Sequence, residues 1–213
     1  HFPVSARVGA VAVIVSLLIG IPLGLLAAVY RGRAIDMASM AFATIGISIP
    51  VFVISVLLMY LFANVLQWLP SYGLTSWRHY ILPVACLSFN PIAYIARQTR
   101  SSMLDALEQD YVRTARSRGN TRRAILGRHV VRNAMIPVIT FLAISMAEIM
   151  TGTIVVEQVF TVPGIGRLLI SSISSRDFPV VQAIVVMMAA WIVLVNFLAD
   201  VINQLVDPRI RLQ

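Results

Sequence analysis

The chain has no lysine, a single cysteine and few charged residues of any kind. The one cysteine, Cys86, excludes an internal disulfide framework. Without lysine there is no phosphate-binding loop of the form G-x-x-x-x-G-K-[ST], so this chain is not the usual kind of ATPase. Charged residues form 12% of the chain, against about 25% in ordinary soluble proteins. This composition excludes a typical soluble globular domain.

Long uncharged runs account for the low share of charged residues. Hydrophobic residues form 59% of the 213 positions, and the mean hydropathy is +0.85. About 20 apolar residues in a helix cross the hydrocarbon core of a bilayer. The sequence therefore predicts an all-α, polytopic membrane protein that forms a single domain over residues 1–213. We expect five spans, at Val8–Tyr30, Met37–Ala63, Tyr80–Ala96, Ala134–Val156 and Pro179–Ile202.

Several residues within the spans are unusual for helices that only face lipid. Gly20 and Gly24 allow neighbouring helices to approach closely, and Pro50 should bend the second span. Asn90 and Glu148 are polar, and we expect Glu148 to be the one ionisable residue deep inside a span. Such groups either bond to another helix or line an aqueous path. We name Asn90 and Glu148 as candidates for lining a path.

The segment from Asp105 to Asn133 is strongly basic, and nine arginines lie between Arg97 and Arg132. One arginine at the centre of a bilayer costs about 2.5–3.5 kcal/mol, so this segment must lie outside the membrane. Its pattern predicts two helices joined by a tight turn. Gly119 suits the left-handed position that follows a helix end.

The distribution of arginine also predicts the orientation in the membrane. With the basic segment in the cytoplasm, thirteen arginines lie inside and four lie outside, which is the usual positive-inside bias. The first residue, His1, is then outside. We therefore expect an earlier span and six spans in the native protein.

Three functions suit a basic helical hairpin at a membrane surface. It could bind anionic lipid headgroups, bind DNA as a helix-turn-helix, or dock a cytoplasmic protein. The apolar residues Tyr111, Val112 and Ala115 before the turn favour docking, because lipid binding needs only charge. The flanking spans leave little room for a DNA duplex. The residues alone leave all three open.

Several motifs resemble those of one protein family. The stretch from Gln109 to Gly119, Q-D-Y-V-R-T-A-R-S-R-G, and the following R-N-A-M-I-P-V at Arg132–Val138 resemble the cytoplasmic loop of B-type permease subunits of bacterial dipeptide and oligopeptide ABC importers. These permeases belong to the binding-protein-dependent transport system inner membrane components. The resemblance continues through Val156–Phe160, Pro163–Arg167, Arg176–Gln182 and Asp207–Arg211.

The resemblance implies the transmembrane domain of a type I ABC importer in the bacterial inner membrane. The chain would form the path for peptides, would not be an enzyme, and would itself hold no cofactor or metal. Its partners would be a second, C-type permease subunit, two cytoplasmic ATPases that bind ATP and Mg, an external substrate-binding protein and membrane lipid. No nucleic acid is expected. Residues 97–133 would form the coupling segment.

The resemblance also implies two groups of site residues. The first docks an ATPase and the second forms an outer gate. ATPase docking is expected at Asp110, Tyr111, Val112, Arg113, Ala115, Arg116 and Gly119, and the outer gate at Phe160, Pro163, Gly164 and Arg167.

Some alternatives stay open. Similar B-type subunits import nickel chelates or glutathione, and a membrane scaffold or receptor would belong to another class. A membrane enzyme is disfavoured because His1, His79 and His129 all fall outside the predicted spans and Cys86 has no reactive neighbour in sequence. A secondary transporter would need more spans and more intramembrane ionisable groups.

Overall fold

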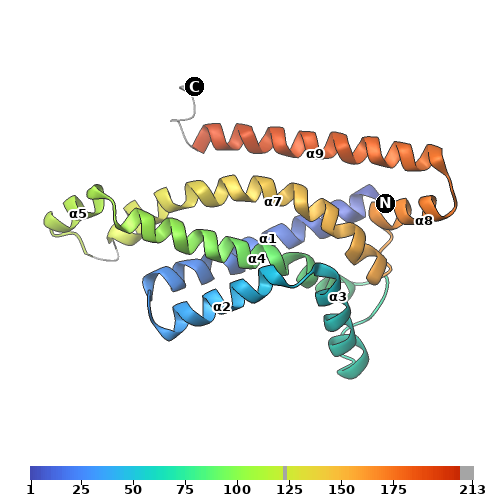
Figure 1. The fold of residues 1–213 in the computed structure, drawn as a ribbon, viewed down its shortest axis with the longest axis horizontal. Coiled ribbons are helices and arrows are strands. Elements are labelled where there is room, and N and C mark those ends of the chain that lie inside the picture. The colour runs from blue at the N-terminus through green and yellow to red at the C-terminus, as the bar shows by residue number, and fades with distance from the viewer. Residues whose placement is uncertain (122–123, 207–213) are drawn as a thin grey trace.

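The computed structural model describes residues 1–121 and 124–206. Among these, the side chains of residues 116, 128, 129, 142–148, 150–152, 199, 202, 203, 205 and 206 are not described. All elements in the described part of the chain are helices (Figure 1), which confirms the all-α prediction. They are α1 (Phe2–Val29), α2 (Ala34–Ser48), α3 (Val51–Met59), the π-helical turns η1 (Tyr60–Val65), α4 (Arg78–Leu107), α5 (Asp110–Ser117), the π-helical turns η2 (Ile125–Val130), α7 (Val131–Val159), α8 (Ile165–Ser174) and α9 (Phe178–Val206).

Three of the described helices, α1, α4 and α9, are long and apolar enough to cross a membrane. Helix α2 and the α3–η1 segment meet this test together but are bent by 103°. The bend falls at Pro50, which precedes α3 in an extended conformation, so the predicted bend is confirmed and is larger than a kink. The fourth predicted span corresponds to α7, where many side chains are not described, so the count of five spans stays a prediction.

Helix α4 occupies the centre of the arrangement, and α1, α2, α3 and α7 all pack against it (Figure 1). The most extensive of these contacts is with α1. Two prolines, Pro83 and Pro91, lie within α4 without ending it. The central helix continues beyond the predicted third span, and its last turns extend toward α5.

Glycines in α1 make the contact with α4 possible. A Cβ atom at Gly24 would lie 2.5 Å from both the carbonyl oxygen of Ala96 and the Cβ of Thr99. A Cβ at Gly20 would lie 2.9 Å from the side chain of Ile95. Both distances are shorter than carbon atoms tolerate, so only glycine permits this helix spacing. The expectation of close packing at these two residues is therefore confirmed.

An ion pair attaches the start of α2 to α4. The Asp36 carboxylate accepts hydrogen bonds from Arg100 Nε at 2.5 Å and Arg100 Nη2 at 2.8 Å, and from the backbone N–H of Gly32 at 2.9 Å. The Asp36 side chain is only 6% exposed. A second pair at the same end, Arg31–Glu108, joins atoms 3.1 Å apart but has both side chains open to solvent. The Asp36–Arg100 pair was not predicted from the sequence, where Arg100 counts only toward the positive charge of the cytoplasmic side.

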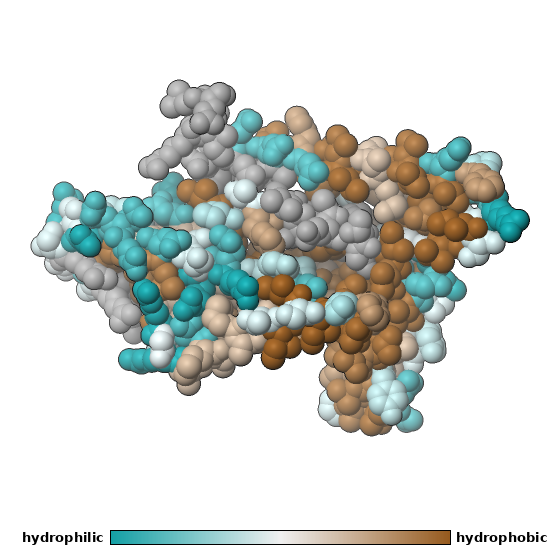
Figure 2. Space-filling model, viewed as in Figure 1, coloured by the Kyte–Doolittle hydropathy of each residue, from teal (hydrophilic) through white to brown (hydrophobic). Residues whose placement is uncertain are grey.

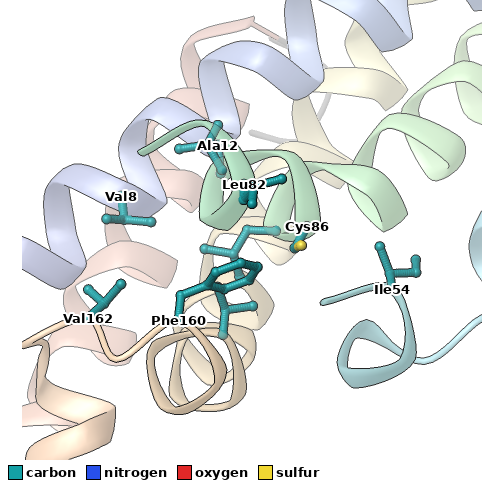
Figure 3. Close-up of a cluster of buried hydrophobic side chains, with 10 residues drawn as sticks. Val8, Ala12, Ile54, Leu82, Cys86, Phe160 and Val162 are labelled. Carbon is teal, nitrogen blue, oxygen red and sulfur yellow. The ribbon is translucent and has the colours of Figure 1, made fainter. Parts of the chain in front are cut away.

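The two ends of the molecule differ in polarity. Figure 2 shows hydrophilic residues gathered over α5 and the neighbouring turns, whereas hydrophobic residues cover α3 and the middle of the visible face. An apolar core lies at the end opposite α5, where side chains from α1, α3, α4 and the end of α7 converge around Phe160 (Figure 3). The polar end is the one predicted to be cytoplasmic.

The contact between α1 and α4 predicts the effect of one added methyl group. Gly24→Ala should lower the free energy of unfolding by about 1–3 kcal/mol, the usual cost of overpacking. Thermal unfolding of the detergent-solubilised protein measures this. Gly127→Ala is the matched control, because a Cβ there meets no atom within 4 Å. A Gly24→Ala protein as stable as the control would contradict the proposed packing.

The Asp36–Arg100 pair predicts a second difference in stability. Asp36→Asn leaves the guanidinium of Arg100 without its anionic partner and should destabilise the fold by about 3 kcal/mol, near the lower end for broken buried pairs. Glu108→Gln removes the exposed pair and should cost at most about 1 kcal/mol. Unfolding titrations in mixed micelles compare the two variants. Equal effects would show that the Asp36–Arg100 pair adds no more than a surface contact.

Candidate functional site

The polar end of the molecule is a helical hairpin built from the last turns of α4, helix α5 and η2. An apolar cluster holds α5 in place. Val112 is fully buried and Ala115 is 8% exposed, and both face their own chain. The remaining buried members come from the neighbouring elements, and they are Ala28, Met103, Ala106, Ile125, Val130 and Ala134. The hairpin is therefore packed against the bundle and does not hang free as a loop.

The turn after α5 has the predicted geometry. Gly119 has a φ angle of 78°, the left-handed region that favours glycine. The N–H of Asn120 donates to the carbonyl oxygen of Ala115 at 3.3 Å, and the N–H of Arg118 donates to that of Thr114 at 3.2 Å. These bonds satisfy the last carbonyl groups of the helix. The prediction that Gly119 is in the left-handed conformation is confirmed.

The outward face of α5 carries the groups that a partner can reach. Asp110 and Arg113 form an exposed pair with atoms 3.8 Å apart. Gly119 is also exposed, whereas Arg116 has a side chain outside the described set. Further along the same face and turn are the exposed residues Thr114, Ser117 and Arg118.

Burial changes the roles of two residues expected to dock an ATPase. Val112 and Ala115 face inward, so they anchor α5 and do not contact a partner in this conformation. The apolar stripe was visible in the sequence, but a stripe does not reveal whether its own chain or a partner covers it. Tyr111 lies between the two faces: its ring packs beside the cluster, and its buried hydroxyl has no hydrogen-bond partner among the described residues.

The two candidates for lining a path differ in what the structure shows. Asn90 is half-buried in α4, and its side-chain oxygen has no partner within the described part of the chain. That leaves it without a visible bond to another helix. Glu148 belongs to α7, but its side chain lies outside the described residues. A path-lining role stays a prediction for both.

The outer turn, between α7 and α8, is more buried than expected. Phe160 is 2% exposed and sits in the apolar core, so it is a packing residue in this conformation. Its carbonyl oxygen accepts a hydrogen bond from the N–H of Gly73 at 3.1 Å, which attaches the loop before α4. Pro163 is exposed and Gly164 is buried. Arg167 is half-buried and donates from Nη1 to the carbonyl oxygen of Thr161 at 3.0 Å.

Glu157 is the polar residue that the sequence analysis missed. It follows the fourth predicted span, which was expected to end at Val156, but it lies in the last turns of α7 and is 1% exposed. Glu157 lies at the end of α7, just beyond the predicted span, so the expectation that Glu148 is the one ionisable residue deep in a span stays a prediction. The glycines of the following V-P-G-I-G motif were a signal, because they leave room for a large neighbouring group.

The chain is similar in sequence to known membrane transport proteins. The family model described as "Binding-protein-dependent transport system inner membrane component" matches residues 20–212. The chain is 42% identical over 211 residues to the dipeptide transport system permease protein DppB of Bacillus subtilis (strain 168), covering 99% of this chain and 68% of that protein. It is 42% identical over 196 residues to the glutathione transport system permease protein GsiC of Escherichia coli (strain K12), covering 92% of this chain and 64% of the relative. The chain thus spans about two thirds of these relatives.

Solved structures share the fold. A chain of the MetNI methionine ABC transporter, solved in inward-facing conformations, aligns with a TM-score of 0.76 at 20% identity and covers 95% of this chain and 93% of its own. A chain of an amino acid ABC transporter with histidines aligns with a TM-score of 0.77 at 16% identity, with coverages of 95% and 91%. The fold is that of ABC-transporter membrane domains. Together with the family match over most of its length, this shows that the chain belongs to the binding-protein-dependent transport system inner membrane components.

Proposed function

We propose that the chain is the permease subunit of an ATP-driven peptide importer in the bacterial inner membrane. Family membership and the dipeptide and glutathione permeases among its relatives support this proposal. The observation that carries the mechanism is the hairpin at the polar end. Its inner face is fixed to the bundle through Val112 and Ala115, and its outer face is open.

The arrangement provides a way to transmit force. A partner that moves α5 also moves the end of α4, because the apolar cluster joins the two helices. Helix α4 in turn carries α1 through the close contact at Gly24 and α2 through the Asp36–Arg100 pair. We infer that these three helices rotate together when the partner changes state. The energy comes from the different affinity of each state for nucleotide and substrate.

The proposed partners follow from the family. Two cytoplasmic ATPases would bind ATP and Mg, and one of them would contact α5. A second, C-type permease would complete the path, and a binding protein would deliver substrate from outside. The family description supports the binding protein, because it names a binding-protein-dependent transport system. Residues 97–133 would form the coupling segment, with Asn90 and Glu148 as candidates along the path.

Peptides are the proposed substrates, because one relative is named for dipeptides and another for glutathione, which is itself a small peptide. Nickel chelates are the alternative cargo. Uptake of labelled dipeptide, glutathione and nickel chelate by vesicles containing the complete complex separates these three. A scaffold or receptor would transport none of them, and its removal would leave uptake unchanged.

Charge reversal on the open face of α5 tests the docking role. The double variant Arg113→Glu, Arg118→Glu should lower substrate-stimulated ATP hydrolysis by about tenfold or more, since exposed arginines are frequent hot spots of interfaces. Membrane insertion should be unchanged, because both side chains are exposed and the apolar anchor is intact.

Arg33→Glu is the matched control for this experiment. Arg33 is another exposed arginine at the polar end, but it lies at the start of α2 and outside the hairpin. The control should retain normal stimulation of ATP hydrolysis. If the double variant also retained it, the open face of α5 would not be where the ATPase docks.

A further inference from the structure

Glu157 joins the end of α7 to the start of the next helix, α8, and to α1, which lies 152 positions away in the sequence. Its carboxylate is at the end of α7, and it accepts hydrogen bonds from the backbone N–H of Gly166 at 2.7 Å and of Arg167 at 3.2 Å, both in the first turn of α8. The hydroxyl of Ser5 in α1 donates to the same carboxylate. All of this lies at the end of the molecule opposite α5, where the chain is predicted to face outward.

Ser5 closes the arrangement. Its hydroxyl oxygen accepts a hydrogen bond from the N–H of Ile165 at 2.9 Å, while its O–H donates a hydrogen bond to the carboxylate of Glu157. The N–H groups at the start of a helix have no partner within that helix. Here Glu157 and Ser5 supply partners to the first three N–H groups of α8. A negative charge at this position is also favoured by the helix dipole. The carboxylate is therefore a cap for α8 supplied by a different helix.

Two glycines leave the space that the carboxylate occupies. A Cβ atom at Gly164 would overlap the carboxylate group of Glu157, and one at Gly166 would overlap the backbone of Ile154 and lie 3.0 Å from the Glu157 carboxylate. Neither glycine has the positive φ angle that would explain it by backbone conformation alone. The V-P-G-I-G motif is thus shaped around Glu157 as well as forming a turn.

A buried glutamate such as Glu157 is unusual at a position whose only role is to pack against neighbouring side chains. Glu157 and Ser5 are 1% and 3% exposed. Burying a carboxylate is costly unless hydrogen bonds compensate for the loss of water. An apolar residue would fill the same space without that cost. A polar contact differs in one useful way, because its groups can be hydrated again when the helices separate.

We propose that Glu157 is a positioning residue that latches the outer ends of α1 and α8 to α7 and so holds the outer side closed. This rests on the proposed function, in which the outer side must open to receive substrate. With the latch formed, the start of α8 is capped and the three helices are held together. When the outer side opens, Ser5 and the N–H groups of α8 separate from the carboxylate, and water takes their places.

The test uses the full-length permease assembled with its ATPases, second permease and binding protein. Spin labels at exposed Ala10 in α1 and Ile173 in α8 report the separation of the two helices. The chain's single cysteine, Cys86, is buried and does not compete for labelling. ATP hydrolysis is measured with and without binding protein and substrate, and uptake is measured in parallel.

Glu157→Ala should raise ATP hydrolysis without substrate by about tenfold, the shift expected for losing a charge-assisted hydrogen bond. It should also abolish stimulation by substrate and lengthen the distance between the labels. Glu157→Gln should restore most of the wild-type behaviour, because its amide oxygen still accepts hydrogen bonds from α8. Asp200→Asn, a change at an exposed carboxylate of α9 outside both the coupling segment and the latch, should match the wild type.

The outcomes separate the latch from the proposed function. If the wild-type complex showed no ATP-driven uptake, the proposed function would be wrong. If it showed uptake while Glu157→Ala kept wild-type label distances and hydrolysis, the latch would be refuted. If Glu157→Ala did not assemble, Ser5→Ala would decide: increased hydrolysis without substrate supports the latch, and unchanged hydrolysis overturns it.

Discussion

The close approach of α1 to α4 is the contact on which the rest of the arrangement depends. Inside a membrane, lipid tails are as apolar as leucine, so helices associate through tight packing and hydrogen bonds and not through the hydrophobic effect. Gly24 provides that packing by bringing the backbone of α1 onto Ala96 and Thr99. On the α2 side, a Cβ at Gly46 would lie 2.8 Å from Ala93. Small residues on several helices thus make α4 the common axis.

Polar contacts then fix the two ends of this apolar bundle. At the polar end, the carboxylate of Asp36 is paired with the guanidinium of Arg100, and this attraction offsets the cost of burying the carboxylate. At the other end, the carboxylate of Glu157 is met by backbone N–H groups and a hydroxyl. One joins α2 to α4, and the other joins α1 and α8 to α7. The apolar contacts between the two ends of the bundle do not require the fixed geometry of hydrogen bonds. The polar contacts at the ends therefore determine how far each helix is shifted along its neighbour.

Features that depend on local chemistry were predictable from the sequence. Long apolar runs indicate α1, α4 and α9, Pro50 interrupts its helix because it lacks an N–H, and Gly119 ends α5. The features that escaped prediction are contacts between residues that lie far apart in the sequence. Asp36 and Arg100 are 64 positions apart, and Ser5 and Glu157 are 152 apart, so no sequence window contains either pair. The burial of Phe160 escaped prediction for the same reason, because its neighbours come from three other helices. The sequence around Phe160 resembles that of a loop, and it does not reveal that other helices surround this segment in the fold.

The division of α5 into two faces explains how a short helix can serve as a rigid contact. A helix of eight residues is not stable alone, because nucleation is costly and few hydrogen bonds repay it. Val112 and Ala115 stabilise α5 because they bury one face of the helix against α4 and η2. The residues that remain outside are therefore free to be charged or small without weakening the fold. Because the buried face is already filled, a partner that pushed on the outer face, as in the proposed function, would move the packed unit as a whole, and the displacement would reach α4 without repacking of side chains in between.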